Sequence, residues 1–272
     1  MKLVPAALAV APILALMAAA PAAAQPLRPV KVEMAYAGVL NALHLPGEMK
    51  VLTMNAVERA GATDFATGAV IQTFGLLRTL KHVDIRTDST GPIEGGVPHP
   101  RAFEFTTVEP KRTKHVTMTW TQAGVLQTPP HHDGGHPPPT AALKLTAADP
   151  VTVFSRALYA RDAAALCATN WRFYDGAQIY ELRFQPGHAI PTQPAERALG
   201  LTAAETCPVT YAEVAGFTHR PGDHKDDWLN GNMIARFGKV GADGPWIFIS
   251  LKADTFLGYA KLELTSVKLD AP

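Results

Sequence analysis

The sequence predicts a mostly β protein, built as a single curved antiparallel sheet or a half-open barrel with one or two short helices. Three observations lead to this fold class. Several stretches alternate apolar and polar residues with a period of two, turn-forming residues separate them, and no repeated strand–helix–strand spacing occurs along the 272 residues. Such alternation is typical of strands that have one face against a core and one face in water.

The alternating stretches define the predicted strands. Their apolar members are, in chain order, Val30, Val32, Met34 and Tyr36; Val116, Met118 and Trp120; Tyr180, Leu182 and Phe184; and Leu262 and Leu264. Val267 and Leu269 continue the last stretch in the opposite phase, which predicts a β-bulge near Thr265 because one extra residue reverses the alternation.

A hairpin is predicted around Asp175-Gly176, which separates residues 171–173 from residues 180–184. Asp-Gly favours a type I′ turn because both central residues of that turn need a positive φ. The sequence therefore predicts two antiparallel strands joined by a tight turn.

The clearest helix begins at Asp149-Pro150. Asp149 can cap the free amides of a first turn, and proline suits the first helical position. The apolar stripe that follows consists of Val151, Phe154, Ala157 and Leu158. A weaker helical stretch is expected over residues 73–80.

Residues 1–24 are predicted to be a signal peptide that is cleaved after Ala24. A basic residue at Lys2, an apolar run over residues 3–20 and an Ala-x-Ala ending are the parts of such a leader. A membrane anchor is the alternative, but Pro5 and Pro12 disfavour a spanning helix. We expect residues 25–272 to form a single β-rich domain in the periplasm of a Gram-negative bacterium, with no transmembrane segment.

The charge balance disfavours a nucleic-acid partner. The chain has 25 Lys plus Arg and 24 Asp plus Glu, and cleavage removes one lysine and no acid. The mature chain is then close to neutral and has no run of basic residues, whereas nucleic-acid binders normally collect positive charge on one face.

Cys167 and Cys207 are the two cysteines of the chain, and we expect them to form a disulfide. An even number of cysteines in an exported protein favours a bond, and here one pairing exists. A catalytic thiol or a metal pair is the alternative. Neither has support nearby, since there is no Cys-x-x-Cys and no histidine within several residues of either cysteine.

Residues 127–140 form a loop rich in proline, histidine and glycine. His131, His132, Asp133 and His136 are sound ligands for zinc, copper or nickel. Glycines and flanking prolines make a poor frame for the rigid geometry that a metal site needs, so we interpret the segment as a solvated surface loop.

A second polar cluster precedes Trp228. Its members are His219, Asp223, His224, Asp226 and Asp227, and Pro221-Gly222 marks a turn among them. A general-acid or metal role is conceivable here, but a charged turn is more often simply solvated.

No catalytic, cofactor-binding or metal-binding residue is predicted. The sequence lacks His-Glu-x-x-His, Gly-x-Ser-x-Gly, a phosphate loop and a dinucleotide fingerprint. A Ser/His/Asp triad assembled from distant segments stays open, because triads form in space rather than in sequence.

Four short motifs resemble an exported family known as domain of unknown function 3108. They are residues 149–154 (Asp-Pro-Val-Thr-Val-Phe), Cys167 with residues 171–182, Cys207 with residues 208–211 and Gly216, and residues 256–258 with 262–264. Gly75-Leu-Leu and residues 87–91 fit more loosely, and the histidine–proline loop departs from the family pattern. The resemblance implies an envelope protein with a curved antiparallel sheet, and it implies no catalytic residues.

These observations together predict a non-enzymatic periplasmic protein that binds an apolar small molecule or an envelope protein. One short helix cannot cover the apolar side of so large a sheet, so we expect an open groove lined by aliphatic and aromatic side chains. The expected wall is the large apolar side that consists of Trp171, Phe173, Tyr180, Leu182 and Phe184, together with Val116, Met118 and Trp120. Two alternatives remain: a hydrolase of an envelope substrate, and a metal-handling protein that uses the histidine-rich loop.

Overall fold

The computed structural model describes residues 29–42, 47–130, 138–217, 232–255 and 258–270. Three sequence predictions lie outside these residues: the signal peptide with cleavage after Ala24, the histidines of residues 131–136, and the polar cluster of residues 219–227. Within the described ranges, no helix is both long enough and apolar enough to cross a membrane.

The fold is one large antiparallel sheet, as predicted. Its strands are β1 (Val30–Ala42), β2 (Met49–Ala60), β3 (Asp64–Thr73), β4 (Asp84–Glu94), β5 (Val97–Pro98), β6 (Ala102–Glu109), β7 (Arg112–Thr121), β8 (Gly124–Thr128), β9 (Asn170–Tyr174), β10 (Ile179–Phe184), β11 (His188–Ile190), β12 (Leu201–Ala215), β13 (Met233–Val240), β14 (Trp246–Thr255) and β15 (Gly258–Asp270). The order across the sheet is β8-β7-β6-β4-β3-β2-β1-β15-β14-β13-β12-β10-β9, with β11 beside β12 and β5 beside β4.

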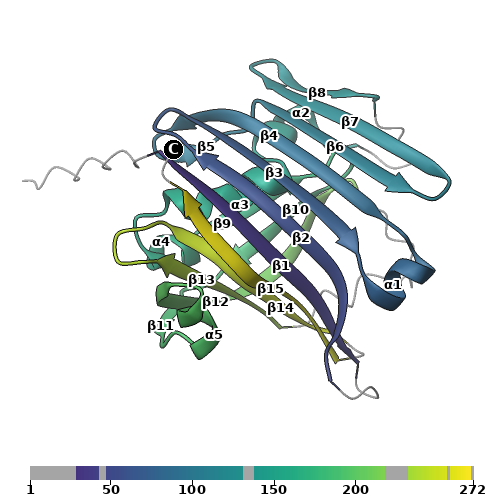
Figure 1. Cartoon of the computed structure of the whole chain (residues 1–272). Coiled ribbons are helices and arrows are strands. Elements are labelled where there is room, and N and C mark those ends of the chain that lie inside the picture. The colour runs from purple at the N-terminus through teal and green to yellow at the C-terminus, as the bar shows by residue number, and fades with distance from the viewer. Residues whose placement is uncertain (1–28, 43–46, 131–137, 218–231, 256–257, 271–272) are drawn as a thin grey trace, which may run out of the picture.

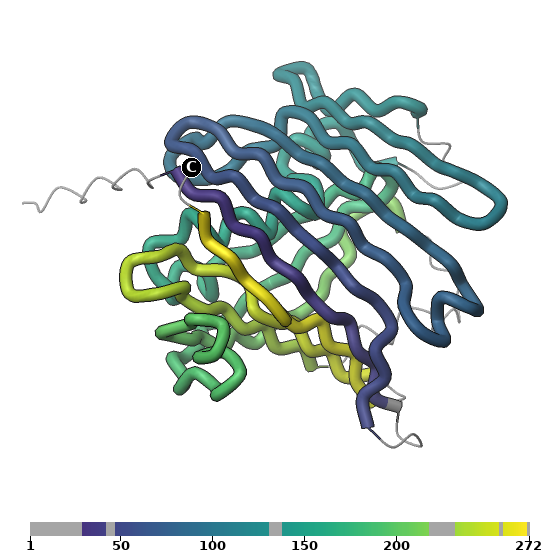
Figure 2. Tube along the Cα trace, viewed as in Figure 1, coloured from purple at the N-terminus to yellow at the C-terminus, as the bar shows by residue number. Residues whose placement is uncertain are grey.

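The sheet curves around a central helix without closing into a barrel. Figure 1 shows β1–β8 in front and α3 (Pro150–Ser155) behind them, and Figure 2 shows the green and yellow C-terminal strands continuing the curve. The end strands β8 and β9 do not pair in the described part of the chain. The connection before α3 bridges them instead: Ala148 pairs with Phe173, and the Trp120 indole N–H donates to the Ala147 carbonyl at 3.1 Å.

The predicted alternation appears in the burial of β1 and β7 but not of β10, where Ile179 and Glu181 are buried and Tyr180 and Leu182 are partly exposed. Val32, Met34 and Tyr36 are buried on β1, and Val116 and Met118 are buried on β7. The predicted bulge is confirmed at the junction of β1 and β15. Ala35 pairs with Ser266 and Tyr36 pairs with Leu264, so Thr265 is the extra residue.

The predicted hairpin forms, but the prediction of a type I′ turn was wrong. Strands β9 and β10 are joined by four residues, 175–178, rather than two. Gly176 has a φ of 95°, whereas no non-glycine residue with a positive φ occurs in the described chain. The Asp175 carboxylate accepts from the amides of Ala177 and Gln178, both at 2.8 Å, and this side-chain turn replaces the backbone geometry of type I′.

The predicted helix at Asp149-Pro150 is α3, and the 3₁₀ turn η1 (Arg156–Tyr159) continues it. The weaker prediction corresponds to α1 (Gly75–Leu80), which begins two residues late because Thr73 still belongs to β3. Three further helices exceed the predicted number: α2 (Ala141–Leu145), α4 (Ala163–Cys167) and α5 (Pro194–Ala198). Each has five residues, too few to give a repeated apolar stripe in the sequence.

The main core is aromatic and lies between α3 and the strands of the C-terminal half. The Trp171 ring centroid is 4.7 Å from that of Phe184 and 5.6 Å from that of Phe237. Phe154 of α3 contacts Phe248 at 5.2 Å between centroids. Side chains therefore fill the concave side of β9–β14.

Cys167 at the end of α4 and Cys207 on β12 lie at disulfide distance, with their Cα atoms 5.5 Å apart. Both side chains are fully buried. This Cα separation is within the range that an unstrained backbone needs for a bond. Such a bond is compatible with an exported protein.

Candidate ligand cavity

Three cross-strand rows of side chains form the inner wall of the sheet from β1 to β7. The first row is Val32, Glu58, Thr67, Ser89, Phe103 and Met118; the second is Met34, Ala56, Ala69, Thr87, Phe105 and Val116; and the third is Tyr36, Met54, Ile71, Ile85, Thr107 and Lys114. Successive rows are two residues apart along each strand, so all three face the same side.

A cavity of about 380 Å³ lies against this wall. The first row is buried throughout, whereas most of the third row is partly exposed and Lys114 is exposed. The cavity is therefore deepest at the first row and opens toward the third. Small residues at the centre of the wall, Ala56 and Ala69, leave the space that a larger side chain would occupy.

Helix α3 forms the opposite wall. Pro150, Val151 and Phe154 line the cavity from the helix, and residues 175–177 of the β9–β10 turn close one side. Phe154 also packs in the aromatic core, with its ring perpendicular to that of Trp171. The helix thus separates a filled half of the concavity from a hollow half.

The position of α3 is fixed by a buried polar cluster at its N-terminus. The Asp149 carboxylate accepts from the amides of Val151 and Thr152, from the Thr152 hydroxyl at 2.6 Å and from the Ser89 hydroxyl at 2.8 Å. Burial raises the pKa of Asp149, and these hydrogen bonds act in the opposite direction. The cluster ties α3 to β4 beside the first row.

Glu58 is the titratable group of the cavity wall, and its side chain is 4% exposed. Burial raises the pKa of its carboxyl to about 7, and a hydrogen bond with Ser155 of α3 opposes the shift. The second oxygen, Oε2, has no hydrogen-bond partner among the described residues, and the same is true of Oγ1 of Thr87. The mainly apolar cavity wall therefore contains two polar atoms without a hydrogen-bond partner among the described residues.

Two other buried carboxylates, Glu181 of β10 and Glu196 of α5, have arginine partners. Glu181 pairs with Arg172 and with Arg183, the latter at 2.9 Å, and Glu196 pairs with Arg236 at 2.6 Å. Burial opposes ionisation of Glu181, but hydrogen bonds from both arginines keep its pKa below the ordinary value. Glu58 differs from them because no such cation lies against it among the described residues.

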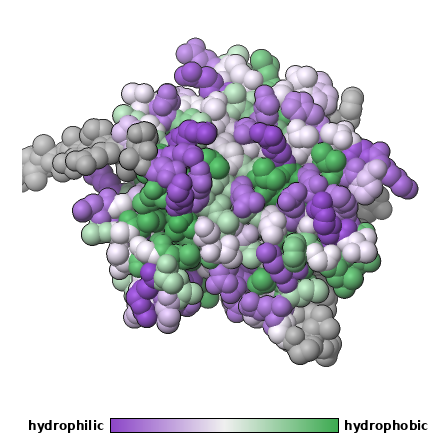
Figure 3. All heavy atoms as spheres, in the orientation of Figure 1, coloured by the Kyte–Doolittle hydropathy of each residue, from purple (hydrophilic) through white to green (hydrophobic). Residues whose placement is uncertain are grey.

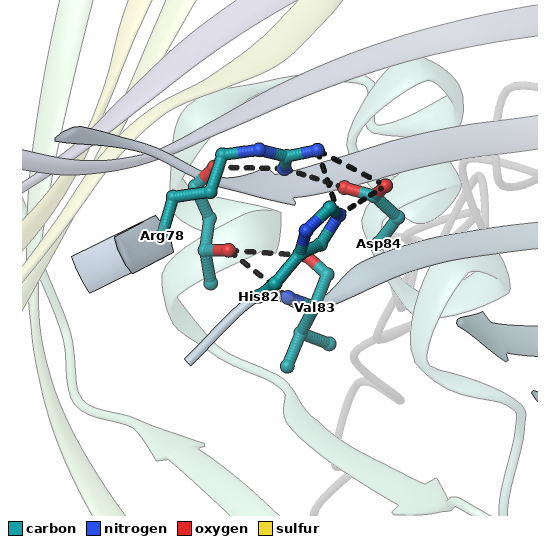
Figure 4. Close-up of polar contacts among 5 residues, drawn as sticks. Arg78, His82, Val83 and Asp84 are labelled. Atoms are coloured by element: carbon teal, nitrogen blue, oxygen red, sulfur yellow. Dashed lines mark hydrogen bonds and ion pairs between the residues drawn. The ribbon is translucent and has the colours of Figure 1, made fainter. Parts of the chain in front are cut away.

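A polar cluster at the opposite end of the strands joins α1 to β4. Figure 4 shows Arg78 donating to the Asp84 carboxylate at 2.7 Å, with the His82 ring 3.1 Å from the other Asp84 oxygen. Hydrogen bonds from Arg78 and His82 lower the pKa of Asp84 to about 2. Arg78 also donates to the Thr73 carbonyl, and Thr73 bonds to the backbone of Val83, so the cluster holds the chain reversal between β3 and β4.

This cluster gives little support to the hydrolase alternative. His82 and Asp84 line neither the cavity nor a second hollow near the β2–β3 turn. Arg78 occupies the space beside the His82 imidazole. The remaining described histidines, His99, His115 and His188, have no ion pair with a carboxylate in the described chain. A histidine–carboxylate pair in a cleft is what that alternative requires.

A second hollow, of about 750 Å³, lies at the end of the strands near the β2–β3 turn. It is more polar, and Lys31, Arg59, Asp64 and Arg101 are among its lining residues. Among the described residues, no group of three or more histidine, cysteine or acidic side chains is placed to hold a metal ion. The outward face of β1–β7 mixes polar and apolar residues, as Figure 3 shows.

The predicted groove wall is only partly that of the cavity, because Val116 lines the cavity and the predicted aromatic residues of β9 and β10 do not. Trp171, Phe173 and Leu182 do not line the cavity, because phenylalanines of β13 and β14 fill the space beside them. Glu58 was missed. The one available signal was the alternation of Ala56, Glu58 and Ala60 with Asn55, Val57 and Arg59. It is weak because alanine and glutamate mark no apolar face and Val57 is apolar on the other face.

Comparison with known proteins does not assign a family. No family model matches the chain, and no curated protein matches it. The chain is similar to a crystal structure of a beta-barrel-like protein of domain of unknown function DUF1849 from Brucella abortus, with 14% sequence identity and a TM-score of 0.44. The similarity covers 90% of this chain and 100% of that one. The resemblance to domain of unknown function 3108 thus stays a prediction.

Proposed function

We propose that the chain is a non-enzymatic binding protein of the bacterial envelope that holds one small apolar molecule in the cavity between α3 and β1–β7. The observation that carries this proposal is the cavity itself, about 380 Å³ in volume and walled mainly by Met, Ile, Ala, Phe and Val side chains. Ligand pockets typically measure roughly 300–1,000 Å³ and are mostly apolar. An empty apolar space of this size costs packing energy that a ligand would recover.

The proposed location is the periplasm, after cleavage following Ala24. The buried cysteine pair supports this location because disulfides persist in oxidising compartments. Membership of the domain of unknown function 3108 family is part of the same proposal. If no ligand enters the cavity, we propose instead that the chain binds an envelope protein.

The test is a fluorescence titration of the protein with an apolar naphthylamine probe, using a matched pair of variants. Ala69 lies at the centre of the cavity wall, and the next residue, Val70, faces outward on the same strand and is 39% exposed. We expect saturable binding of one probe per chain, weakened at least about tenfold by Ala69→Phe and unchanged by Val70→Phe.

Circular dichroism checks that both variants fold, and Ala56→Leu serves as a milder filling variant because a phenylalanine can overpack the core. Binding that is equal in wild type and in every folded filling variant would refute the cavity as the site. If the wild-type protein shows no saturable binding, the small-molecule proposal is refuted and binding of an envelope protein is the remaining proposal.

A further inference from the structure

The deep end of the cavity contains polar atoms that the fold does not satisfy. Glu58 Oε2 and Thr87 Oγ1 are buried and have no partner among the described residues, and both residues line the cavity. Leaving a buried polar group unpaired is destabilising, because the group has lost its hydrogen bonds to water. Two such groups in one apolar cavity are therefore unexpected if the cavity is only a packing defect.

The neighbouring cluster at the start of α3 satisfies its polar groups, whereas two further buried atoms without a partner among the described residues, Arg156 Nε and Tyr159 Oη of η1, belong to residues that do not line the cavity. Ser89 lies in the same row as Glu58, and its hydroxyl contacts Asp149 at 2.8 Å and Thr152 at 2.9 Å. That cluster is closed, with each group bonded to another protein group. Glu58 and Thr87, which carry the unpaired atoms, line the cavity, whereas Ser89, Asp149 and Thr152 do not.

The position of Glu58 sets which end of a ligand would meet it. Glu58 belongs to the buried first row, and Thr87 belongs to the second. The third row, which is more exposed, offers Met54, Ile71 and Ile85. A ligand that satisfies Glu58 must therefore place a polar group at the deep end and its apolar body toward the opening.

We infer that the ligand is an amphiphile whose polar end is an uncharged hydrogen-bonding group, a hydroxyl or an amide, seated against Glu58 at the deep end of the cavity. This inference rests on the proposed function, because it specifies the ligand of the same site. A hydroxyl can donate a hydrogen bond to Oε2 of Glu58, and a hydroxyl or an amide has both a donor and an acceptor for the polar atoms of the wall.

The charge of the site argues for a neutral head group. Burial brings the pKa of Glu58 to about 7, and the titratable groups that respond to its charge are the phenols of Tyr36 on β1 and Tyr159 on η1. No cation compensates Glu58 among the described residues, so a ligand carboxylate would add a second uncompensated negative charge in an apolar space. A ligand ammonium would have to lose its hydration to reach the same place.

The competing orientation places a negative head group at the opening. Lys114 is exposed at the end of the third row and could pair with the carboxylate of a fatty acid whose chain points inward. In that arrangement Glu58 would touch no polar part of the ligand. The two orientations make opposite demands on Glu58 and Lys114, so substitution separates them.

The experiment is displacement of the bound naphthylamine probe by three ligands with the same decyl chain: decanol, decanoate and decylamine. Each is titrated into wild type, Glu58→Gln, Glu58→Leu and Lys114→Gln. We expect decanol to be the best competitor for wild type. Glu58→Leu should weaken decanol at least about tenfold, whereas Glu58→Gln should keep it within about threefold because an amide can still hydrogen bond. Lys114→Gln should leave decanol unchanged.

Probe binding is measured in every variant and tests the proposed function, whereas the ranking of the three ligands tests the inference about Glu58. The two can therefore be refuted independently. If the probe does not bind wild type, the proposed function fails. If the probe binds and decanoate competes best, with that advantage lost in Lys114→Gln, the inference about Glu58 is wrong. It is also wrong if Glu58→Leu folds, binds the probe and leaves the ranking of the three ligands unchanged.

Discussion

At the scale of single residues, Glu58 decides how the cavity wall behaves. Its nearest neighbours on the wall are Val32 and Thr67 in the same row and Ala56 in the next row, so no adjacent residue of the wall offsets its charge. Burial therefore favours the protonated form in the folded protein, while the unfolded chain exposes the same group to water. Because the pKa of Glu58 differs between the folded and unfolded states, the free energy of unfolding depends on pH.

The folded pKa of Glu58, about 7, lies above its ordinary value of 4.5. Between these values the folded state binds more protons than the unfolded state, so the free energy of unfolding falls as pH rises through this window. We predict that Glu58→Gln removes a loss of roughly 3 kcal/mol between about pH 5 and about pH 8. Urea unfolding at the two pH values measures it.

The exposed Glu104 on the neighbouring part of the sheet provides the control. Glu104→Gln should keep the wild-type difference between the two pH values. An identical pH dependence in wild type and Glu58→Gln would mean that Glu58 is hydrated in the folded protein, contrary to its burial.

At the scale of elements, the sequence was informative wherever a local chemical signal exists. Asp149-Pro150 predicted the start of α3 because a cap and a first-turn proline act within a few residues. The reversed alternation at Thr265 predicted a bulge because the side-chain period of a strand is two. The turn at Asp175 was misjudged because its side chain, which accepts two amides, allowed a longer loop.

The cavity strands gave weaker signals for a physical reason. A wall that must leave space uses small or polar residues, such as Ala56, Ala69 and Thr87, and these blur the apolar alternation. Strands β2, β3 and β4 were accordingly not assigned from the sequence. The location of the cavity depends on which concave half the phenylalanines of β13 and β14 fill, and that is a property of pairing between distant strands.

The element-scale prediction concerns the link between α4 and β12. We expect labelling of the unfolded, unreduced protein to find no free thiol, because Cys167 and Cys207 are bonded. Replacing both by alanine should lower the free energy of unfolding by roughly 2–5 kcal/mol, since closure of the intervening loop no longer restricts the unfolded chain. Denaturant titration measures the change.

Reduction of the wild-type protein should give a comparable loss of stability, and reductant should have no effect on the double-alanine variant. Two reactive thiols in protein recovered from the periplasm would contradict both the bond and its role.

At the scale of the whole molecule, one short helix lies between the two halves of a curved sheet. On one side α3 packs Phe154 against Trp171 and Phe248, and on the other it faces the small side chains of β2–β4. A helix of six residues cannot fill a concavity bounded by so many strands. The hollow half is the consequence, and it is the basis of the proposed function.

The most direct test is a crystal structure of the protein grown with a long-chain alcohol that carries bromine at its apolar end. We expect an anomalous bromine peak inside the cavity, toward Met54 and Ile85, with the hydroxyl at Glu58. A bromine peak outside this space, or a cavity closed by its own side chains in protein that still binds the alcohol, would contradict it.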